Sequence, residues 1–246
     1  MRLRALALFC LIALTFACQK PPSENPRESS STPRVGLTAD PVRGAEVSGT
    51  VSFEGPLPKV VPIDMSADPG CRGDNASESV VVHDGKLANV FVYVRGSFIF
   101  SPPTAPVVVE QRGCKYVPHV VAVAVSQPVE FRNADPTVHN IHGQPKRNTA
   151  WNVSQTSQKP AITRTFARAE SMIPVKCNQH PWMNMYVNVS DSPFFAVTDA
   201  HGHFSLNGIP AGTYDIVLVH ETLGQQTQSV TLRAKEQKAL DVSFRR

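Results

Sequence analysis

Short runs of β-branched and aromatic residues, each ended by a turn signal, recur from Ala45 to the end of the chain. In residues 90–94 three valines alternate with two aromatic residues, which places the two sets on opposite faces of an extended strand. Turn pairs such as Asp84-Gly85 separate the runs, and the 21 prolines of the chain disfavour helices. The pattern predicts an all-β chain of one or two sandwiches.

One segment departs from this alternation. Residues 233–240 have a helix-forming composition, but the segment is too short to change the fold class. Elsewhere strands are expected around residues 47–53, 90–94, 121–125, 129–131, 162–166, 186–189, 204–206, 214–219 and 242–244.

Residues 1–18 have the pattern of an export signal. Arg2 and Arg4 precede an apolar run at residues 5–16, which is too short to span a bilayer and is typical of a signal peptide. The run ends at Ala17-Cys18, which resembles a bacterial lipobox and predicts that Cys18 is acylated as the mature N-terminus. Ordinary signal cleavage is the alternative. We therefore expect the protein in the cell envelope, in the periplasm or at the outer membrane, anchored to the membrane by lipid.

Residues 19–44 are predicted to form a disordered tether. They contain five prolines and three consecutive serines, a composition that buries too little apolar surface to fold. Beyond the tether the chain carries 18 Lys and Arg against 17 Asp and Glu, because six of 24 and three of 20 lie in residues 1–44. A nearly neutral body without a basic stripe does not support a nucleic-acid partner, and we expect none.

The five cysteines of the chain differ in the role that their position suggests. The chain has Cys10, which lies inside the signal, Cys18, Cys71, Cys114 and Cys177. Cys177 opens a C-x-x-H-x-x-M run that continues with His180 and Met183. Copper favours a thiolate, an imidazole and a thioether on one loop, and a second imidazole from elsewhere would complete a His₂Cys site with a weak axial methionine.

A stretch upstream supplies the second imidazole. Residues 129–140 read V-E-F-R-N-A-D-P-T-V-H-N, an aromatic-x-Pro motif at residues 116–118 precedes them, and the Cys177 run follows. In this order these features resemble the cupredoxins, especially the plastocyanin and amicyanin group, over roughly residues 105–192. The resemblance implies a Greek-key β-sandwich that holds one copper ion, which cycles between Cu⁺ and Cu²⁺.

The resemblance also assigns roles to residues. It makes His139, Cys177 and His180 the in-plane ligands of copper. Met183 becomes the axial ligand, and Asn140 joins the two ligand segments through hydrogen bonds. His180, flanked by apolar side chains, is expected to be the ligand nearest to solvent.

Two alternatives remain for the ligands. His142 is a rival for His139, and Met185 is a rival for Met183; the spacing of the family favours His139 and Met183. The chain also departs from the family, since Val175 stands where an aromatic residue is usual and the glycine of the preceding turn is missing. Neither departure removes a ligand, but both leave the geometry of the site open.

Cys71 and Cys114 are left once Cys18 is assigned to the lipid and Cys177 to copper. In an oxidising compartment such a pair is expected to form a disulfide. The closed loop would span 114 − 71 = 43 positions. In the chain-entropy account a loop of this size stabilises the fold by about 4 kcal/mol.

A second resemblance lies near the C-terminus. Residues 198–214 read T-D-x-x-G-x-F-x-L-x-G-x-P-x-G-x-Y and resemble the carboxypeptidase regulatory-like domains, which have a transthyretin-like β-sandwich. The resemblance implies a sandwich made of residues 45–97 and 193–246, interrupted by the cupredoxin at residues 98–192. The alternative assigns residues 45–97 to the cupredoxin as extra strands.

We expect no enzyme activity, because copper with four protein ligands has no open position for a substrate and the sequence shows no nucleophile–base set. The cupredoxin resemblance implies single-electron transfer, with a c-type cytochrome or another small redox protein as partner. The alternative is a non-redox role, either copper buffering or a cell-surface structural or binding module. The turn His201-Gly202-His203 is a weaker candidate for a further metal ion.

Overall fold

The described part of the chain is built from strands, turns and loops. The computed structural model describes residues 38–39, 42–57, 59–73, 75–157 and 159–246. The predicted signal, Cys18 and most of the predicted tether lie outside the described residues. All regular elements within those ranges are β-strands, which confirms the all-β class. The described residues include no helix of the length and apolar character needed to cross a membrane.

Every expected run falls on a strand, and the segment 233–240 contributes a strand in place of a helix. The strands at residues 107–111, 139–143, 151–155, 170–176 and 224–232 were not expected. In the described residues the strands are β1 (Ala45–Glu54), β2 (Val82–His83), β3 (Lys86–Leu87), β4 (Phe91–Arg95), β5 (Val107–Gln111), β6 (Tyr116–Val117), β7 (Val120–Ala124), β8 (Val129–Asn133), β9 (His139–Gly143), β10 (Trp151–Gln155), β11 (Ile162–Arg164), β12 (Glu170–Lys176), β13 (Asn184–Ser190), β14 (Phe195–Val197), β15 (His203–Ile209), β16 (Gly212–His220), β17 (Gly224–Leu232), β18 (Gln237–Ala239) and β19 (Val242–Arg245).

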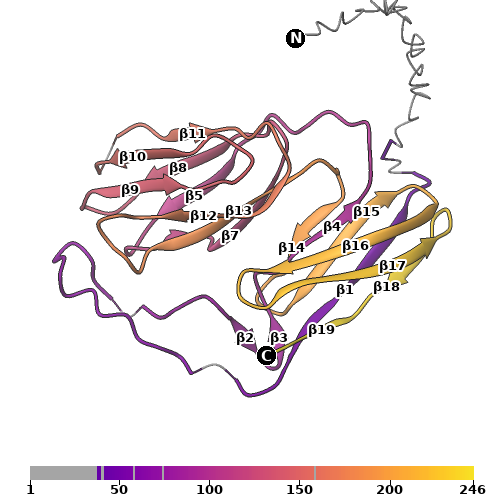
Figure 1. Ribbon diagram of the computed structural model, residues 1–246, viewed down its shortest axis with the longest axis horizontal. Coiled ribbons are helices and arrows are strands. Elements are labelled where there is room, and N and C mark those ends of the chain that lie inside the picture. Colours follow the sequence, from indigo (N-terminus) through magenta and orange to yellow (C-terminus); the bar gives the residue numbers. More distant parts are fainter. Residues whose placement is uncertain (1–37, 40–41, 58, 74, 158) are drawn as a thin grey trace, which may run out of the picture. The chain divides into compact units, whose positions relative to one another are not determined.

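Two sheets that draw on both ends of the described chain form a first sandwich (Figure 1). One has the strand order β15-β1-β3-β2, with β18 and β19 also paired to β1, and the other has the order β14-β4-β16-β17. Burial alternates along β15, which turns Phe204 and Leu206 into a core shared by both sheets. The buried residues of this core come from residues 45–94 and 194–244.

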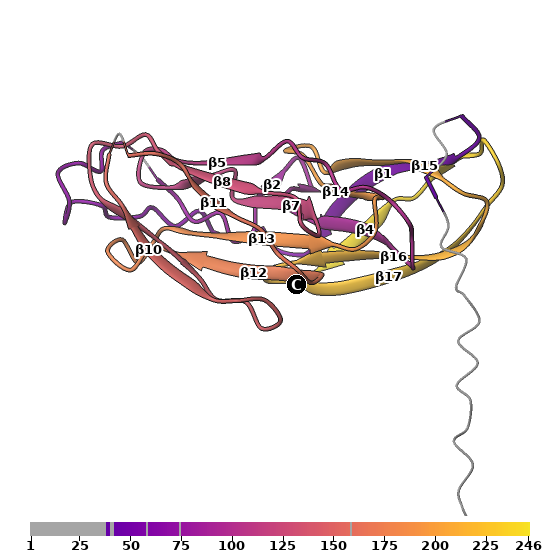
Figure 2. The same cartoon turned by 90° about the horizontal axis from the view of Figure 1, so that it is seen from above.

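The strands between residues 107 and 190 form a second sandwich. Its sheets have the orders β10-β9-β12-β13-β7 and β11-β8-β5-β6. Figure 2 shows β5 and β8 in one layer and β12 and β13 in the other. The fully buried side chains of Phe131, Ile141 and Val187 lie in the core of this sandwich. The neighbours β9 and β12 in the larger sheet carry the segments that hold the predicted metal ligands.

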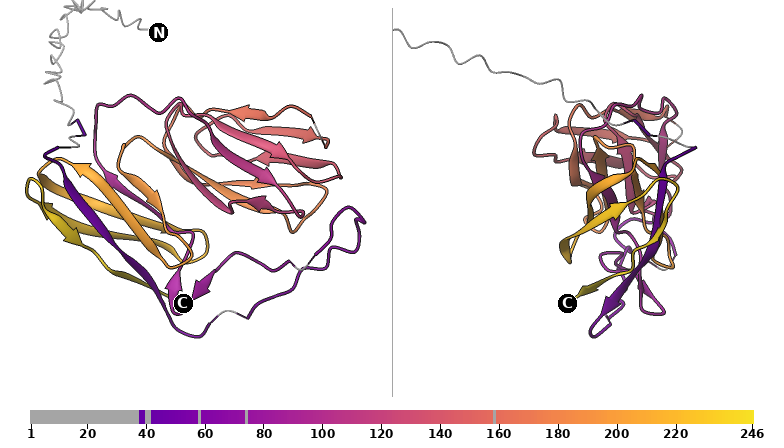
Figure 3. Two further views of the ribbon diagram at one scale, coloured as in Figure 1. Left: turned by 180° about the vertical axis from the view of Figure 1, so that it is seen from behind. Right: turned by 90° about the vertical axis from the view of Figure 1, so that its right-hand side faces the viewer.

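The chain between β1 and β2 leaves the first sandwich and contributes to the second core, a path that can be followed in Figure 3. Met65 and Cys71 are buried in the second core, and Cys71 forms a disulfide with Cys114 at a Cα–Cα distance of 5.5 Å. The expected division placed all of residues 45–97 in the first sandwich. The structure differs here because the disulfide and the apolar side chain of Met65 hold this segment against the second core.

The chain leaves the first sandwich for the second, and returns from it, at neighbouring strands of the first sandwich. Strand β4, which precedes it, pairs antiparallel with β14, which follows it, and Tyr93 lies opposite Phe195. The N–H of Val94 donates to the carbonyl oxygen of Phe194 at 3.0 Å. The chain therefore returns to the point it left before it continues into β15.

Candidate metal centre

Two neighbouring strands bring the predicted ligands to one end of the second sandwich. His139 is the first residue of β9, and Cys177 follows directly after the last residue of β12. The antiparallel register pairs His142 with Lys176, so the next residues along β12 approach the start of β9. His180 and Met183 lie in the loop that joins β12 to β13.

Three of the predicted ligands converge on one point. The Nδ1 atoms of His139 and His180 are 3.0 Å apart, and the Sγ of Cys177 is 3.5 Å from the Nδ1 of His180. One ligand atom from each of the three residues lies within 4.8 Å of the other two. The exposed fractions of His139, Cys177 and His180 are 0%, 3% and 3%. A thiol and two imidazole nitrogens that meet in the buried interior are the in-plane donor set that suits copper.

Met183 is held close to this cluster by the backbone of the loop. The N–H of Cys177 donates to the carbonyl oxygen of Met183 at 3.0 Å, and the N–H of Met183 donates to that of His180 at 2.8 Å. The side chain of Met183 is 1% exposed and belongs to the second core. Its rival Met185 is also buried, but it lies within β13 opposite Val175.

Asn140 links the two segments that carry the ligands. Its N–H points to the Sγ of Cys177 at 3.3 Å, and its Oδ1 accepts a hydrogen bond from the N–H of Asn178 at 3.3 Å. Its Nδ2 donates to the Oδ1 of Asn152 on β10 at 2.6 Å. Asn140 thus fixes both the thiol and the start of the ligand loop relative to β9.

His142 lies outside the cluster. Its Nδ1 is 2.9 Å from the Oδ1 of Asn178, and no group of converging ligand atoms found in the described residues includes it. Successive side chains of a strand point to opposite faces, so a shift of three residues from His139 turns His142 away. Of the two rivals, the structure brings only His139 to Cys177 and His180.

Two carboxylates that the sequence did not reveal as part of the site hold the far nitrogens of the imidazoles. The Nε2 of His139 is 2.8 Å from the Oδ2 of Asp135, which also accepts the N–H of Cys114 at 2.9 Å. The Nε2 of His180 is 2.9 Å from the Oδ2 of Asp68, which also accepts the hydroxyl of Thr137 at 2.7 Å. A carboxylate on Nε2 orients the ring and leaves Nδ1 free for a metal.

The disulfide connects the segment that carries Asp68 to a cysteine whose backbone is hydrogen-bonded to Asp135. Asp68 lies three residues before Cys71, and the partner cysteine, Cys114, donates its N–H to Asp135. The carbonyl oxygen of Cys114 accepts the indole N–H of Trp182 at 3.2 Å. One covalent bond thus joins the segment of Asp68, which contacts His180, to the backbone that holds Asp135 beside His139.

His180, at 3%, is with Cys177 the most exposed of the four predicted ligands, but all four are buried. Asp68 covers its Nε2, and the ring of Trp182 packs against it with the ring centroids 5.2 Å apart. The covering segment belongs by sequence to the first half of the chain, 112 residues before His180. This cover explains why His180 is only 3% exposed.

The electrostatics favour a thiolate beside an imidazolium in the metal-free protein. Burial lowers the pKa of His139, but the hydrogen bond to Asp135 and the charge of Cys177 outweigh burial and raise it to about 9. Burial raises the pKa of the Cys177 thiol, but hydrogen bonds from His139 and from the N–H of Asn140 lower it to about 6. Hydrogen bonds from Thr137 and His180 lower the pKa of Asp68 to about 2, so this group is a carboxylate at neutral pH.

A pH titration of the metal-free chain is expected to show the ultraviolet absorbance of the Cys177 thiolate with a midpoint near pH 6. A free cysteine would titrate at about pH 8.5. Because the pKa is depressed in the folded state, the thiolate stabilises the fold fully above the unfolded value and loses this contribution as the pH falls through about 6. Cys177→Ala is the control that should remove the transition. A midpoint at the value of a free thiol would contradict the described hydrogen bonds.

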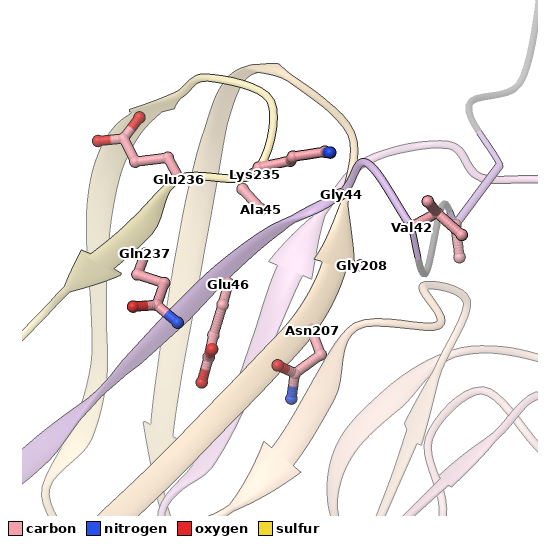
Figure 4. Close-up of a pocket in the computed structure, with 10 residues that line it drawn as sticks. Val42, Gly44, Ala45, Glu46, Asn207, Gly208, Lys235, Glu236 and Gln237 are labelled. Carbon is pink, nitrogen blue, oxygen red and sulfur yellow. The ribbon is translucent and has the colours of Figure 1, made fainter.

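A surface pocket of the first sandwich has a different character (Figure 4). It lies where β1 begins, and polar side chains such as those of Glu46, Lys235 and Gln237 line it. None of its ten lining residues is a histidine, cysteine or methionine, so this pocket offers neither an imidazole nor a sulfur ligand. The cluster at Cys177 remains the candidate metal centre.

No protein-family model matches the chain, and no curated protein matches it. The similar solved structures include the Cu-containing nitrite reductase from Thermus scotoductus SA-01, with 20% identity over 39% of this chain and 24% of that one at a TM-score of 0.33. Amicyanin from Paracoccus versutus is 26% identical over 36% of this chain and 84% of its own, at a TM-score of 0.32. A purple cupredoxin from Nitrosopumilus maritimus is 19% identical over 34% and 99%, at a TM-score of 0.30.

The similar structures are therefore cupredoxins, and each covers well under half of this chain. The chain itself spans about a quarter of the nitrite reductase.

Proposed function

We propose that the chain binds one copper ion through His139, Cys177 and His180, with Met183 as the axial ligand, and that it transfers single electrons. The observation that carries this proposal is the convergence of the Sγ and two Nδ1 atoms in a pocket where both Nε2 atoms already have carboxylate partners. Bound copper would supply a one-electron couple between Cu⁺ and Cu²⁺.

The residues of the chain would act by holding this donor set still. Asp135 and Asp68 fix the two ring orientations, and Asn140 fixes the thiol. Because these partners are themselves hydrogen-bonded, the ligands cannot rearrange freely when the charge of the site changes. The proposal includes no enzymatic step, since all four ligand positions would be filled by the protein.

Copper buffering is a second candidate function, and the burial of His180 favours it. A carrier exchanges electrons through an edge that a partner can approach, whereas His180 is 3% exposed beneath Asp68. A covered site holds its ion but slows contact with a partner. The two candidates share the same ligands and differ in whether the loaded site accepts an electron from outside.

The surroundings of the site are proposed from the sequence. A c-type cytochrome or another small redox protein would be the partner, and lipid on Cys18 with the tether of residues 19–44 would hold the protein at the membrane of a bacterial cell envelope. The first sandwich, which resembles the carboxypeptidase regulatory-like domains, would serve as a scaffold or a contact surface.

Loading the chain with one equivalent of Cu²⁺ and mixing it with reduced cytochrome c tests the proposal. We expect one bound ion, an intense visible band from the thiolate–copper pair, and loss of that band as the cytochrome becomes oxidised. The outcome that favours buffering is a bound ion whose band persists beside the reduced cytochrome. Absence of stoichiometric copper binding would contradict both candidates.

A further inference from the structure

None of the four proposed ligands has an edge that a redox partner could touch. All four residues are buried, and Asp68 covers the Nε2 of His180. Electron transfer falls off steeply with distance and is faster through packed atoms than through a gap. An electron that reaches the site must therefore cross at least one residue that is not a ligand.

Trp182 is an aromatic residue that packs against the ligands. It lies two residues after His180 in the loop between β12 and β13, and the two ring centroids are 5.2 Å apart with 45° between the ring planes. In the described part of the chain, the ligand histidines have two ring contacts, one between His139 and His180 and one between His180 and Trp182. Among these residues Trp182 is thus the non-ligand ring in contact with the cluster.

The same indole also reaches solvent. Trp182 is half-buried and lines a cavity of about 210 Å³, together with Ile63 and the proposed axial ligand Met183. Two further residues of the lining, Ser77 and Asn184, are exposed, so the cavity opens to the surface. Trp182 therefore contacts both a ligand and a cavity that solvent can enter.

A hydrogen bond holds the indole in one orientation. Its Nε1–H donates to the carbonyl oxygen of Cys114 at 3.2 Å, and Cys114 is buried and bonded to Cys71 in the disulfide. A buried indole N–H usually has such a partner, and here the partner is anchored covalently. The separation between the indole and His180 is therefore well defined.

The second tryptophan of the chain provides a contrast. Trp151 lies on β10 and packs edge-on against Phe166, with the ring centroids 5.6 Å apart. It belongs to the border of the second core, and the ring contacts of the described residues do not join it to a ligand. Trp151 is thus the same residue type in the same sandwich without contact with the ligand rings.

We propose that electrons enter and leave the site through the indole of Trp182, which the redox partner approaches at the cavity. The inference rests on the proposed function, because it requires bound copper. One electron passes from the ferrous haem of a cytochrome, which becomes ferric, to Cu²⁺, which becomes Cu⁺. Trp182 is a bridge and is itself neither oxidised nor reduced. This route lets a site with buried ligands act as a carrier.

Mixing the copper-loaded full chain with increasing concentrations of reduced cytochrome c tests the route. We expect Trp182→Leu to lower the limiting rate of copper reduction about tenfold or more, while the copper stoichiometry and the visible band stay unchanged. Trp151→Leu makes the same change in the same sandwich and is the matched control, which should keep the rate. The reduction potential of each variant separates a change in driving force from a change in route.

Fluorescence gives a readout that does not depend on electron transfer from a partner. The chain has two tryptophans, so Trp151→Phe leaves Trp182 as the emitter and Trp182→Phe leaves Trp151. One equivalent of Cu²⁺ should quench most of the emission of Trp182 and much less of that of Trp151, because quenching by a bound paramagnetic ion is short-ranged. Equal quenching in the two variants would contradict the contact on which the route depends.

An unchanged limiting rate in Trp182→Leu would overturn the proposal, as would an equal loss in Trp151→Leu. A weaker apparent affinity for the cytochrome at an unchanged limiting rate would also overturn it, because Trp182 would then be a contact surface alone. Failure of the unmodified chain to bind copper or to accept an electron is a different result. It would overturn the proposed function, and the route with it.

If Trp182→Leu fails to bind copper, Ser77→Arg decides the question. Ser77 is exposed and lines the cavity, whereas Ser66, on the same segment between β1 and β2, is exposed and does not line it. Ser77→Arg should slow the reduction of copper by the cytochrome. Ser66→Arg adds the same charge and should not slow it. Equal rates in these two variants would overturn the route.

Discussion

Replacement of Cys177 by serine is expected to abolish the visible band of the copper-loaded chain and to weaken copper binding by about a thousandfold or more. The Sγ of Cys177 lies 3.5 Å from the Nδ1 of His180, and the lowered thiol pKa of about 6 makes it an anion at neutral pH. A serine hydroxyl stays protonated at that pH and is a harder, weaker ligand. Absorption spectroscopy and competition with a copper chelator measure both effects.

A pair of histidine variants provides the control for this prediction. His139→Ala should lose the site nearly as completely, because its Nδ1 faces that of His180 at 3.0 Å. His142→Ala should leave the band and the affinity nearly unchanged, because its ring contacts Asn178 outside the cluster. If His142→Ala removed the band and His139→Ala preserved it, the assignment of the second imidazole would be wrong.

Removal of the disulfide by Cys71→Ala and Cys114→Ala is expected to lower the free energy of unfolding by about 4 kcal/mol. The bond closes a loop with a sequence separation of 43, and both half-cystines are buried in the second core. The same double variant should release bound copper to a chelator faster, because the bond holds the segment whose Asp68 covers His180. Urea denaturation and the rate of chelator-driven copper loss measure the two effects.

The variant Asp68→Ala distinguishes the effect of the Asp68 carboxylate on copper loss from the effect of the disulfide. It keeps the disulfide but removes the carboxylate from the Nε2 of His180, so copper loss should accelerate with a much smaller effect on stability. Asp64→Ala is the matched control, since Asp64 lies on the same segment and accepts the N–H of Ser66. Copper loss at the same rate in Asp68→Ala and Asp64→Ala would show that the segment does not close the site.

The all-β class could be predicted because strand alternation and turn chemistry are local properties. The side chains of Phe204 and Leu206 point inward as their spacing indicates. The segment 233–240 shows the limit of local reasoning. Its composition suits a helix, yet Gln237–Ala239 forms β18 and pairs in parallel with β1. A partner strand almost two hundred residues away outweighed a propensity of a few tenths of a kcal/mol per residue.

Much of the candidate site could also be predicted, because its ligands lie in two short segments. His139 comes from one strand, and Cys177, His180 and Met183 come from one loop. Asp135 lies four residues before His139 in the same strand exit, but its role was not predicted. The sequence gives it no local pattern that distinguishes a partner of His139 from an ordinary turn aspartate.

Asp68 could not be predicted in this way. It lies 112 residues from His180 and meets it only because the chain between β1 and β2 crosses to the second core. The same packing explains why His180 is buried beneath Asp68. The ligands in a loop can be predicted from the residues of that loop. The segment that shields them from solvent depends on how distant parts of the chain pack.

The pairing of β4 with β14 makes the second sandwich an insertion at the tip of a hairpin. Because Tyr93 and Phe195 face each other, a short turn could replace everything between these strands without moving their ends. Hairpin tips accept inserted domains readily, since loop length costs little free energy. The two sandwiches are nevertheless linked, because the segment between β1 and β2 of the first contributes Asp68 and Cys71 to the second. An excised copy of residues 98–192 would keep the four proposed ligands and lose the lid over one of them.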